Sequence, residues 1–266
     1  MSVADAPVLS TEQLVELVDL LKGVDSVELK LTVPSSARRA AVTALGMDPL
    51  DGQLRQVVFF DTPDLTLNKQ GLILRARRVQ GRAGDSVVKL RPVDPAALPA
   101  SLRADPTYSV EVDVLPGGFI CSGSMKVQVS DHHVKEVIAG DRPIRDLYNK
   151  HQRALITETV GSGWLTGLDV LGPINVLKLK WTPAGLDQRL VAELWLYPNG
   201  TPLLELSTKC APADAFAVAA TAKAFLASHG VDLGAPQQTK THTALEMFSA
   251  ELRQNASADA PAAVSH

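Results

Sequence analysis

Charged side chains recur at every second position in several segments of this sequence. Two examples are Ser26-Val-Glu28-Leu-Lys30 and Arg75-Ala-Arg77, in which an ionic residue alternates with an apolar one. A period of two places alternate side chains on opposite faces of a β-strand. Seven segments show this pattern, with basic members Lys30, Arg75, Arg77, Lys89, Arg91, Lys178, Lys180 and Lys209, and acidic members Glu28, Glu111, Asp113, Glu193 and Glu205.

The ionic faces predict a site for a polyanion together with a divalent cation. Eight of these residues are basic and five are acidic, although the whole chain has a net charge of −3. A local surplus of basic groups favours a ligand that carries several negative charges, such as a chain of phosphates. Carboxylates are the hard oxygen ligands that Mg²⁺ or Mn²⁺ prefers, so the acidic residues are candidate ligands for one of these ions.

The apolar faces of the same strands must be covered, and the expected helices can cover them. The sequence predicts amphipathic helices over residues 10–22, 37–45 and 213–229, the first of them introduced by a capping box at Ser10 to Gln13. Helices that pack outside a closed sheet would leave the charged faces around the barrel axis. The alternative is a charged outer surface in contact with water, which fits any one strand but fits seven poorly. We therefore predict an α+β, mainly antiparallel fold with a closed β barrel and a charged interior.

The rest of the chain sets limits on organisation and on partners. Residues 1–249 are expected to form one domain, with weak strand signals between 115 and 170, a short helix near 242–252, and a disordered tail over 250–266. The negative net charge argues against nucleic acid or an acidic membrane as a partner. No signal peptide or transmembrane run is indicated, so a cytoplasmic location is expected. Cys121 and Cys210 fit two reduced thiols, and the sequence contains no phosphate-binding GxxxxGK[ST] loop and no GxSxG elbow.

Several of these motifs resemble the CYTH family of triphosphate tunnel metalloenzymes. That family includes thiamine triphosphatases, inorganic triphosphatases and class IV adenylate cyclases. It opens with Glu-x-Glu-x-Lys, which is similar to Ser26-Val-Glu28-Leu-Lys30 here, and continues with an Asp-Thr turn and an Arg-x-Arg strand, similar to FFDTPDLTLNKQGLILRARR at 59–78. The resemblance covers about residues 26–248, with an insertion near 115–170, and Lys240 resembles the lysine of the family's closing segment.

The resemblance implies an eight-stranded tunnel that holds a triphosphate and either Mg²⁺ or Mn²⁺. Implied catalytic residues are Glu28, Glu193 and Glu205. Implied metal ligands are Glu28, Glu111, Asp113, Glu193 and Glu205, and the implied substrate-binding residues are Lys30, Arg75, Arg77, Lys89, Arg91, Lys178, Lys180, Lys209 and Lys240. Two residues depart from the family pattern, because Ser26 and Ser207 stand where it places carboxylates near the metal.

Three functional hypotheses follow from these residues and from the resemblance. The sequence does not identify the group that is attached to the triphosphate. The first is hydrolysis of a triphosphate with a divalent metal, by attack of water. The second, motivated by Ser26 and Ser207, is binding of polyphosphate or a nucleotide without catalysis. The third is adenylate cyclase activity of the class IV type. His242 lies in the segment expected to close the tunnel, where it is either a substrate contact or an exposed helical residue.

Overall fold

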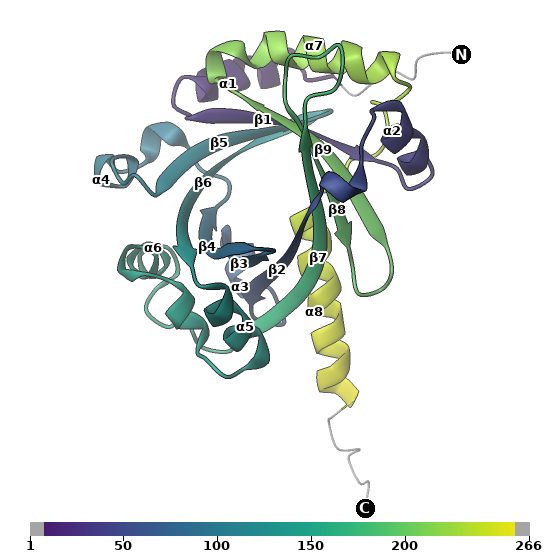
Figure 1. Ribbon diagram of the computed structural model, residues 1–266. Helices are drawn as coiled ribbons and strands as arrows, with labels where there is room; N and C mark the ends of the chain where they lie inside the picture. The colour runs from purple at the N-terminus through teal and green to yellow at the C-terminus, as the bar shows by residue number, and fades with distance from the viewer. Residues whose placement is uncertain (1–7, 259–266) are drawn as a thin grey trace, which may run out of the picture.

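A closed β barrel forms the centre of the protein (Figure 1). The structure is a computed structural model that describes residues 8–258. Around the barrel the order is β1 (Ser26–Val33), β5 (Tyr108–Leu115), β6 (Gly118–Val129), β4 (Arg82–Leu90), β3 (Leu72–Val79), β2 (Gln53–Asp61), β7 (Asp169–Trp181), β8 (Leu190–Leu196) and β9 (Pro202–Cys210). Pairing of β9 with β1 closes the ring, and all neighbours are antiparallel except β1 and β5, which are parallel. The closed, mainly antiparallel barrel was predicted, but these residues form nine strands where eight were expected.

The uncounted strand is β6, which lies within the region interpreted as an insertion. Its sequence from Cys121 to Ser124 is small and weakly alternating, so it lacks the pattern that marks the other strands. Packing explains one of these small residues, because a Cβ atom on Gly123 would lie 1.8 Å from the Tyr108 hydroxyl oxygen. Only the part of 115–170 that follows β6 leaves the barrel. It contains α5 (Asp131–Ala139) and α6 (Lys150–Val160), which lie outside the sheet (Figure 1).

Helices cover much of the outer surface of the barrel. On α1 (Thr11–Leu21), Leu17 joins a core with the outward side chains of β5, such as Val110 and Val112. Elsewhere, α2 (Arg38–Ala44) and α7 (Ala215–Ser228) cover β1 and β9, where Phe225 packs with Leu204 and Leu206. The shorter helical segments are α3 (Thr66–Lys69), α4 (Ala100–Arg103) and 3₁₀ turns at Pro49–Asp51, Pro95–Ala97, Ile144–Leu147 and Pro212–Asp214. No helix among residues 8–258 has the length and apolar character needed to cross a membrane.

The last helix, α8 (Lys240–Ala258), packs against the inner face of the barrel. Its residues Leu245 and Phe248 form a core with Val57, Phe59 and Trp195, three side chains that face the interior. Part of the interior is therefore apolar and filled by a helix. The ionic faces of the strands had predicted a charged interior instead. The helix also continues past the predicted start of the tail at residue 250, since the apolar stripe continues to Leu252. The remainder of the predicted tail, 259–266, lies outside the described residues.

Candidate functional site

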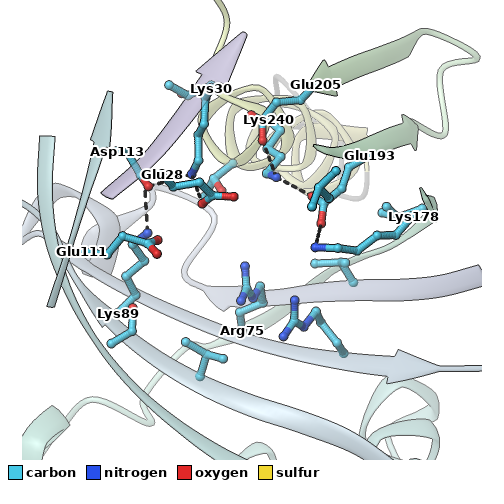
Figure 2. Close-up of a pocket in the computed structure, with 18 of the residues that line it drawn as sticks. Glu28, Lys30, Arg75, Lys89, Glu111, Asp113, Lys178, Glu193, Glu205 and Lys240 are labelled. Atoms are coloured by element: carbon cyan, nitrogen blue, oxygen red, sulfur yellow. Dashed lines mark hydrogen bonds and ion pairs between the residues drawn. The ribbon is translucent and has the colours of Figure 1, made fainter. Parts of the chain in front are cut away.

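One cavity of about 720 Å³ occupies the charged part of the barrel interior (Figure 2). Every residue that the sequence singled out as a site residue lines it, namely Glu28, Lys30, Arg75, Arg77, Lys89, Arg91, Glu111, Asp113, Lys178, Lys180, Glu193, Glu205, Lys209 and Lys240. Twelve of them come from seven strands, where alternation turns their side chains inward; Arg91 directly follows β4, and Lys240 lies in the first turn of α8. The structure thus brings all fourteen to one space, while their catalytic and binding roles stay predictions.

Three carboxylates from adjacent strands form the first acidic group. The parallel pairing of β1 with β5 places Glu28 opposite Asp113 and Ser26 opposite Glu111. One oxygen of each of Glu28, Glu111 and Asp113 lies within 4.8 Å of the others. We call these three residues the β1–β5 carboxylates. The Ser26 hydroxyl donates to Glu111 at 3.2 Å, so the serine in the family's carboxylate position orients this group instead of adding a charge to it.

Lysines on the wall keep two of the β1–β5 carboxylates, Asp113 and Glu28, ionised. The Lys30 ammonium lies 2.8 Å from Asp113 and 3.1 Å from Glu28. Burial alone would raise the pKa of Asp113, but Lys30 and then Lys89 outweigh it and hold that pKa well below its usual value. Burial would also raise the pKa of Glu28, and Lys30 reverses this. Clustered carboxylate oxygens are hard donors of the kind that Mg²⁺ or Mn²⁺ binds, together with phosphate oxygens of a substrate, so these residues fit such an ion.

The other two predicted metal ligands form a separate acidic group, which we call the β8–β9 carboxylates. Glu193 and Glu205 face each other across β8 and β9. The Lys240 ammonium contacts both: it donates to Glu205 at 2.7 Å and makes a still shorter contact with Glu193. Lys178 donates to the remaining oxygen of Glu193 at 2.6 Å (Figure 2).

These contacts give the β8–β9 carboxylates a counter-ion from the protein itself. Burial would raise the pKa of Glu193, but Lys240 and Lys178 hold it well below its usual value. Burial would lower the pKa of Lys240, and Glu193 and Glu205 instead raise it. Lys240 also lies 5.6 Å from the centre of the Trp195 ring, a distance at which cation–π attraction adds to the ion pairs. A metal at this position would have to displace a well-held ammonium.

The cations on the opposite wall are less well balanced. Arg77 makes a two-point contact with Asp85, at 2.8 and 2.7 Å, whereas Arg75 has no ion pair among residues 8–258 and its Nε has no hydrogen-bond partner. Burial and the neighbouring Arg77 lower the pKa of Arg75 to about 10. Burial, only partly opposed by Asp113, lowers the pKa of Lys89 to about 8. Buried cations that lack partners are stabilised by an added anion.

Three further basic residues line the cavity but were missed in the sequence. Arg55 shares a strand face with Val57 and Phe59, so its face reads as apolar; Lys126 lies on the unrecognised strand β6; and Arg189 directly precedes β8. Alternation could have identified Arg189, because it lies an even number of positions before Glu193 and therefore on the same face. With these, twelve basic and five acidic residues line the cavity. Asp25, the acidic residue next to Ser26, does not line the cavity: its carboxylate accepts a hydrogen bond from the Val110 amide and pairs with Arg103.

Comparison with known proteins supports the fold. The sequence matches no family model and no curated protein sequence. Among solved structures, a putative adenylyl cyclase from Hippeastrum, described as having a dominant triphosphatase activity, aligns with a TM-score of 0.62 at 18% identity, over 83% of this chain and 95% of that one. A putative adenylate cyclase from Bacillus halodurans aligns with a TM-score of 0.58 at 14% identity, over 83% of this chain and 97% of that one. This chain therefore has the closed tunnel fold of the CYTH-type cyclase and triphosphatase structures, which is the fold that the sequence resemblance predicted.

Proposed function

We propose that this protein binds a triphosphate in the barrel and hydrolyses it with the help of Mg²⁺ or Mn²⁺. The observation that carries the proposal is the charge of the cavity, where twelve basic residues face five acidic ones in a chain of net charge −3. Such a surplus in a partly desolvated space is unfavourable by itself and is relieved by a polyanion. Burial first, and neighbouring cations second, lower the pKa values of Arg75 and Lys89 in this space.

The chain's own residues would act mainly by position and charge. Guanidinium groups such as that of Arg75 suit pairs of phosphate oxygens, and lysines such as Lys89 act as point charges. In hydrolysis, water attacks the terminal phosphorus, the bond from that phosphorus to the bridging oxygen breaks, and the bridging oxygen leaves with the remaining diphosphate part of the substrate. Cations on several sides of the cavity would neutralise the charge on the transferred group and on the leaving group.

A divalent ion would be held by the β1–β5 carboxylates. The three oxygens within 4.8 Å of one another support this assignment, whereas Glu193 and Glu205 already share Lys240. When bound, Mg²⁺ or Mn²⁺ supplies a further positive charge beside the phosphates. Glu193 would then position Lys178 and Lys240 at the cavity, and Glu205 would position Lys240.

Binding without turnover is the second candidate function. It is favoured by the sequence departures, because Ser26 and Ser207 remove two expected carboxylates, and by Lys240, which pairs with two more. Fewer free carboxylates weaken a site for a hard cation.

Phosphate release from tripolyphosphate, ATP and thiamine triphosphate tests these alternatives. We expect turnover of at least one substrate in Mg²⁺ or Mn²⁺, and loss of turnover with EDTA. Tripolyphosphate binding with no release of phosphate from any substrate would support a binding protein instead. Formation of cyclic AMP from ATP would indicate cyclase activity. A protein that binds none of the three compounds contradicts the proposal.

A further inference from the structure

An apolar pocket lies behind the tunnel wall, between α7 and the outer face of the barrel. Its volume is about 240 Å³, and we call it the α7 pocket. Outward side chains of β1, β5 and β9, such as Leu29, Val114 and Leu206, form its floor, and α7 forms its roof (Figure 1). Because alternate residues of a strand face opposite sides, Leu29 lines this pocket while the charged groups of Glu28 and Lys30 face the tunnel.

Short side chains on α7 leave the pocket open. The α7 residues that line it follow the i, i+3, i+4, i+7 spacing of one helix face, and they are Ala219, Ala222, Lys223 and Leu226. An alanine side chain is a single methyl group, so the two alanines on this face do not fill the space between the helix and the sheet.

The floor of the pocket shows the same incomplete packing. On the outer face of β1, Val27 and Leu31 are 0% and 5% exposed. Leu29 lies between them on that face, but it is only partly buried and joins none of the three apolar cores formed by residues 8–258. The outer face of β1 is therefore covered at both sides of Leu29 and left open at Leu29 itself.

An open apolar pocket of this size suits an apolar ligand. Protein interiors are close-packed, and side chains that line a void lose the dispersion contacts that they would otherwise make. An apolar cavity of about 150 Å³ stays dry and binds benzene. The α7 pocket is larger and is lined mainly by leucine, valine and alanine, so a short alkyl chain would restore the missing contacts.

Lys223 determines the charge that such a ligand can carry. It is the one charged residue of α7, it is exposed, and it lines the pocket, which therefore reaches the surface at an ammonium group. Lys223 has no ion-pair partner within the described part of the chain, and the described lining includes no carboxylate. The other polar groups are already engaged, since Lys30 pairs with Asp113 on the tunnel side and the Thr208 hydroxyl donates to the Arg189 carbonyl at 3.0 Å. An anionic head group is thus favoured at the mouth, and a cationic one is disfavoured.

We propose that the α7 pocket binds a medium-chain fatty acid, with its alkyl chain between α7 and β1 and its carboxylate at Lys223. The inference does not depend on the proposed function, because the pocket and the charged cavity lie on opposite faces of β1. A ligand in the pocket would contact the back of the strand that carries Glu28 and Lys30.

Filling the pocket tests the inference. Ala219 is partly buried and lines the pocket, so Ala219→Leu places an isobutyl group in the space assigned to the alkyl chain. Ala224→Leu is the matched control, because Ala224 lies on the same helix, is exposed and does not line the pocket. Titration calorimetry would measure octanoate binding to the wild type and to both variants. We expect Ala219→Leu to weaken octanoate binding about tenfold or more and Ala224→Leu to leave it within about twofold.

Replacing the lysine tests the charge of the ligand. Lys223→Met keeps a long apolar side chain and removes the ammonium. An exposed ion pair contributes little, so octanoate binding should weaken by about two- to fivefold, while binding of octanol, the neutral analogue, stays unchanged. Equal changes for octanoate and octanol, or no change for either, overturn the assignment of an anionic ligand.

The remaining outcomes also decide the question. A wild type that binds no octanoate in the millimolar range overturns the inference, as does a folded Ala219→Leu variant with unchanged octanoate affinity. If Ala219→Leu does not fold by circular dichroism, Ala222→Val, which fills the same face of α7 with a smaller side chain, is measured in its place with the same expected loss. A wild type that binds octanoate but no tripolyphosphate supports this inference and contradicts the proposed function, and the reverse result does the opposite.

Discussion

The two acidic groups on the barrel wall are both built from carboxylates but have different counter-ions. The β8–β9 carboxylates share the ammonium of Lys240, and their side chains are only 12% and 4% exposed. The β1–β5 carboxylates meet lysines too, but Glu28 and Glu111 are 24% and 19% exposed, and oxygens of all three residues converge. The β1–β5 carboxylates are thus the better candidate metal ligands because their oxygens converge and two of them are more exposed, even though Lys30 contacts Glu28 and Asp113.

The origin of Lys240 explains why the groups differ. It belongs to the first turn of α8, and the helix is anchored by Leu245 and Phe248 on the apolar part of the inner wall. Packing of an apolar helix face therefore determines which acids are neutralised. The ion pairs in turn fix the start of the helix against β8 and β9.

The largest effect is expected from removing Lys240. The Lys240→Ala variant would leave Glu193 with Lys178 as its remaining partner and would leave the buried Glu205 without an ion-pair partner among residues 8–258. Loss of one partner of a buried ion pair costs about 3–5 kcal/mol. Urea denaturation would measure the free energy of unfolding, with Lys135→Ala, an exposed lysine on α5, as the control. A loss below about 1 kcal/mol, the value of a surface pair, would contradict the counter-ion role of Lys240.

The next largest effect concerns the metal. Mutation of a residue that only hydrogen-bonds to a metal ligand reduces metal affinity or activity by about 10–100-fold. Replacing a metal ligand itself should cost at least as much, so Glu28→Gln should lower the rate of metal-dependent hydrolysis by about 100-fold or more. Glu193→Gln should alter stability more than the metal requirement. The rate of hydrolysis, measured as a function of Mn²⁺ concentration, distinguishes the two variants. If both variants need the same increase in Mn²⁺ concentration, both acidic groups hold the ion.

The strands that carry the site could be read from the sequence because alternation is a local property. Positions such as Lys30, Lys89 and Glu193 face inward for the same reason, the period of two along a strand whose other face is apolar. Where that pattern is absent, the prediction failed: β6 carries Gly123 and serines in place of large apolar residues, and Arg55 shares its face with Val57 and Phe59.

The pairing of charges could not be predicted in the same way. Lys240 and Glu193 are 47 positions apart, and their contact depends on α8 entering the barrel. The predicted helix near 242–252 was placed correctly, but its amphipathic pattern does not say which surface it covers. The inner wall was expected to be charged throughout, so an apolar binding face for a helix was not considered.

A third prediction compares two arginines on the barrel wall, one with a carboxylate partner and one without. Arg75 has no carboxylate partner among the described residues, whereas Arg77 is held by Asp85. Each charge-assisted contact to phosphate is worth about 1.5–3 kcal/mol, so both Arg75→Ala and Arg77→Ala should weaken tripolyphosphate binding by about ten- to hundredfold. Only Arg77→Ala leaves a buried carboxylate without its main partner, so it alone should lower the free energy of unfolding. Exposed Arg39→Ala is the control, and equal stability losses would remove the distinction.

The smallest effect is a dependence on pH at Lys89. Its pKa is lowered to about 8, so its ammonium is largely charged at pH 7 and largely neutral at pH 9 in the free protein. Tripolyphosphate should therefore bind more weakly as the pH rises through 8, with a loss of less than about tenfold because one of many cations is involved. Lys89→Arg keeps its charge throughout this range and should flatten the profile, which calorimetry at constant ionic strength would measure. A wild type and a Lys89→Arg variant with the same profile would show that another group, or the ligand itself, is titrating.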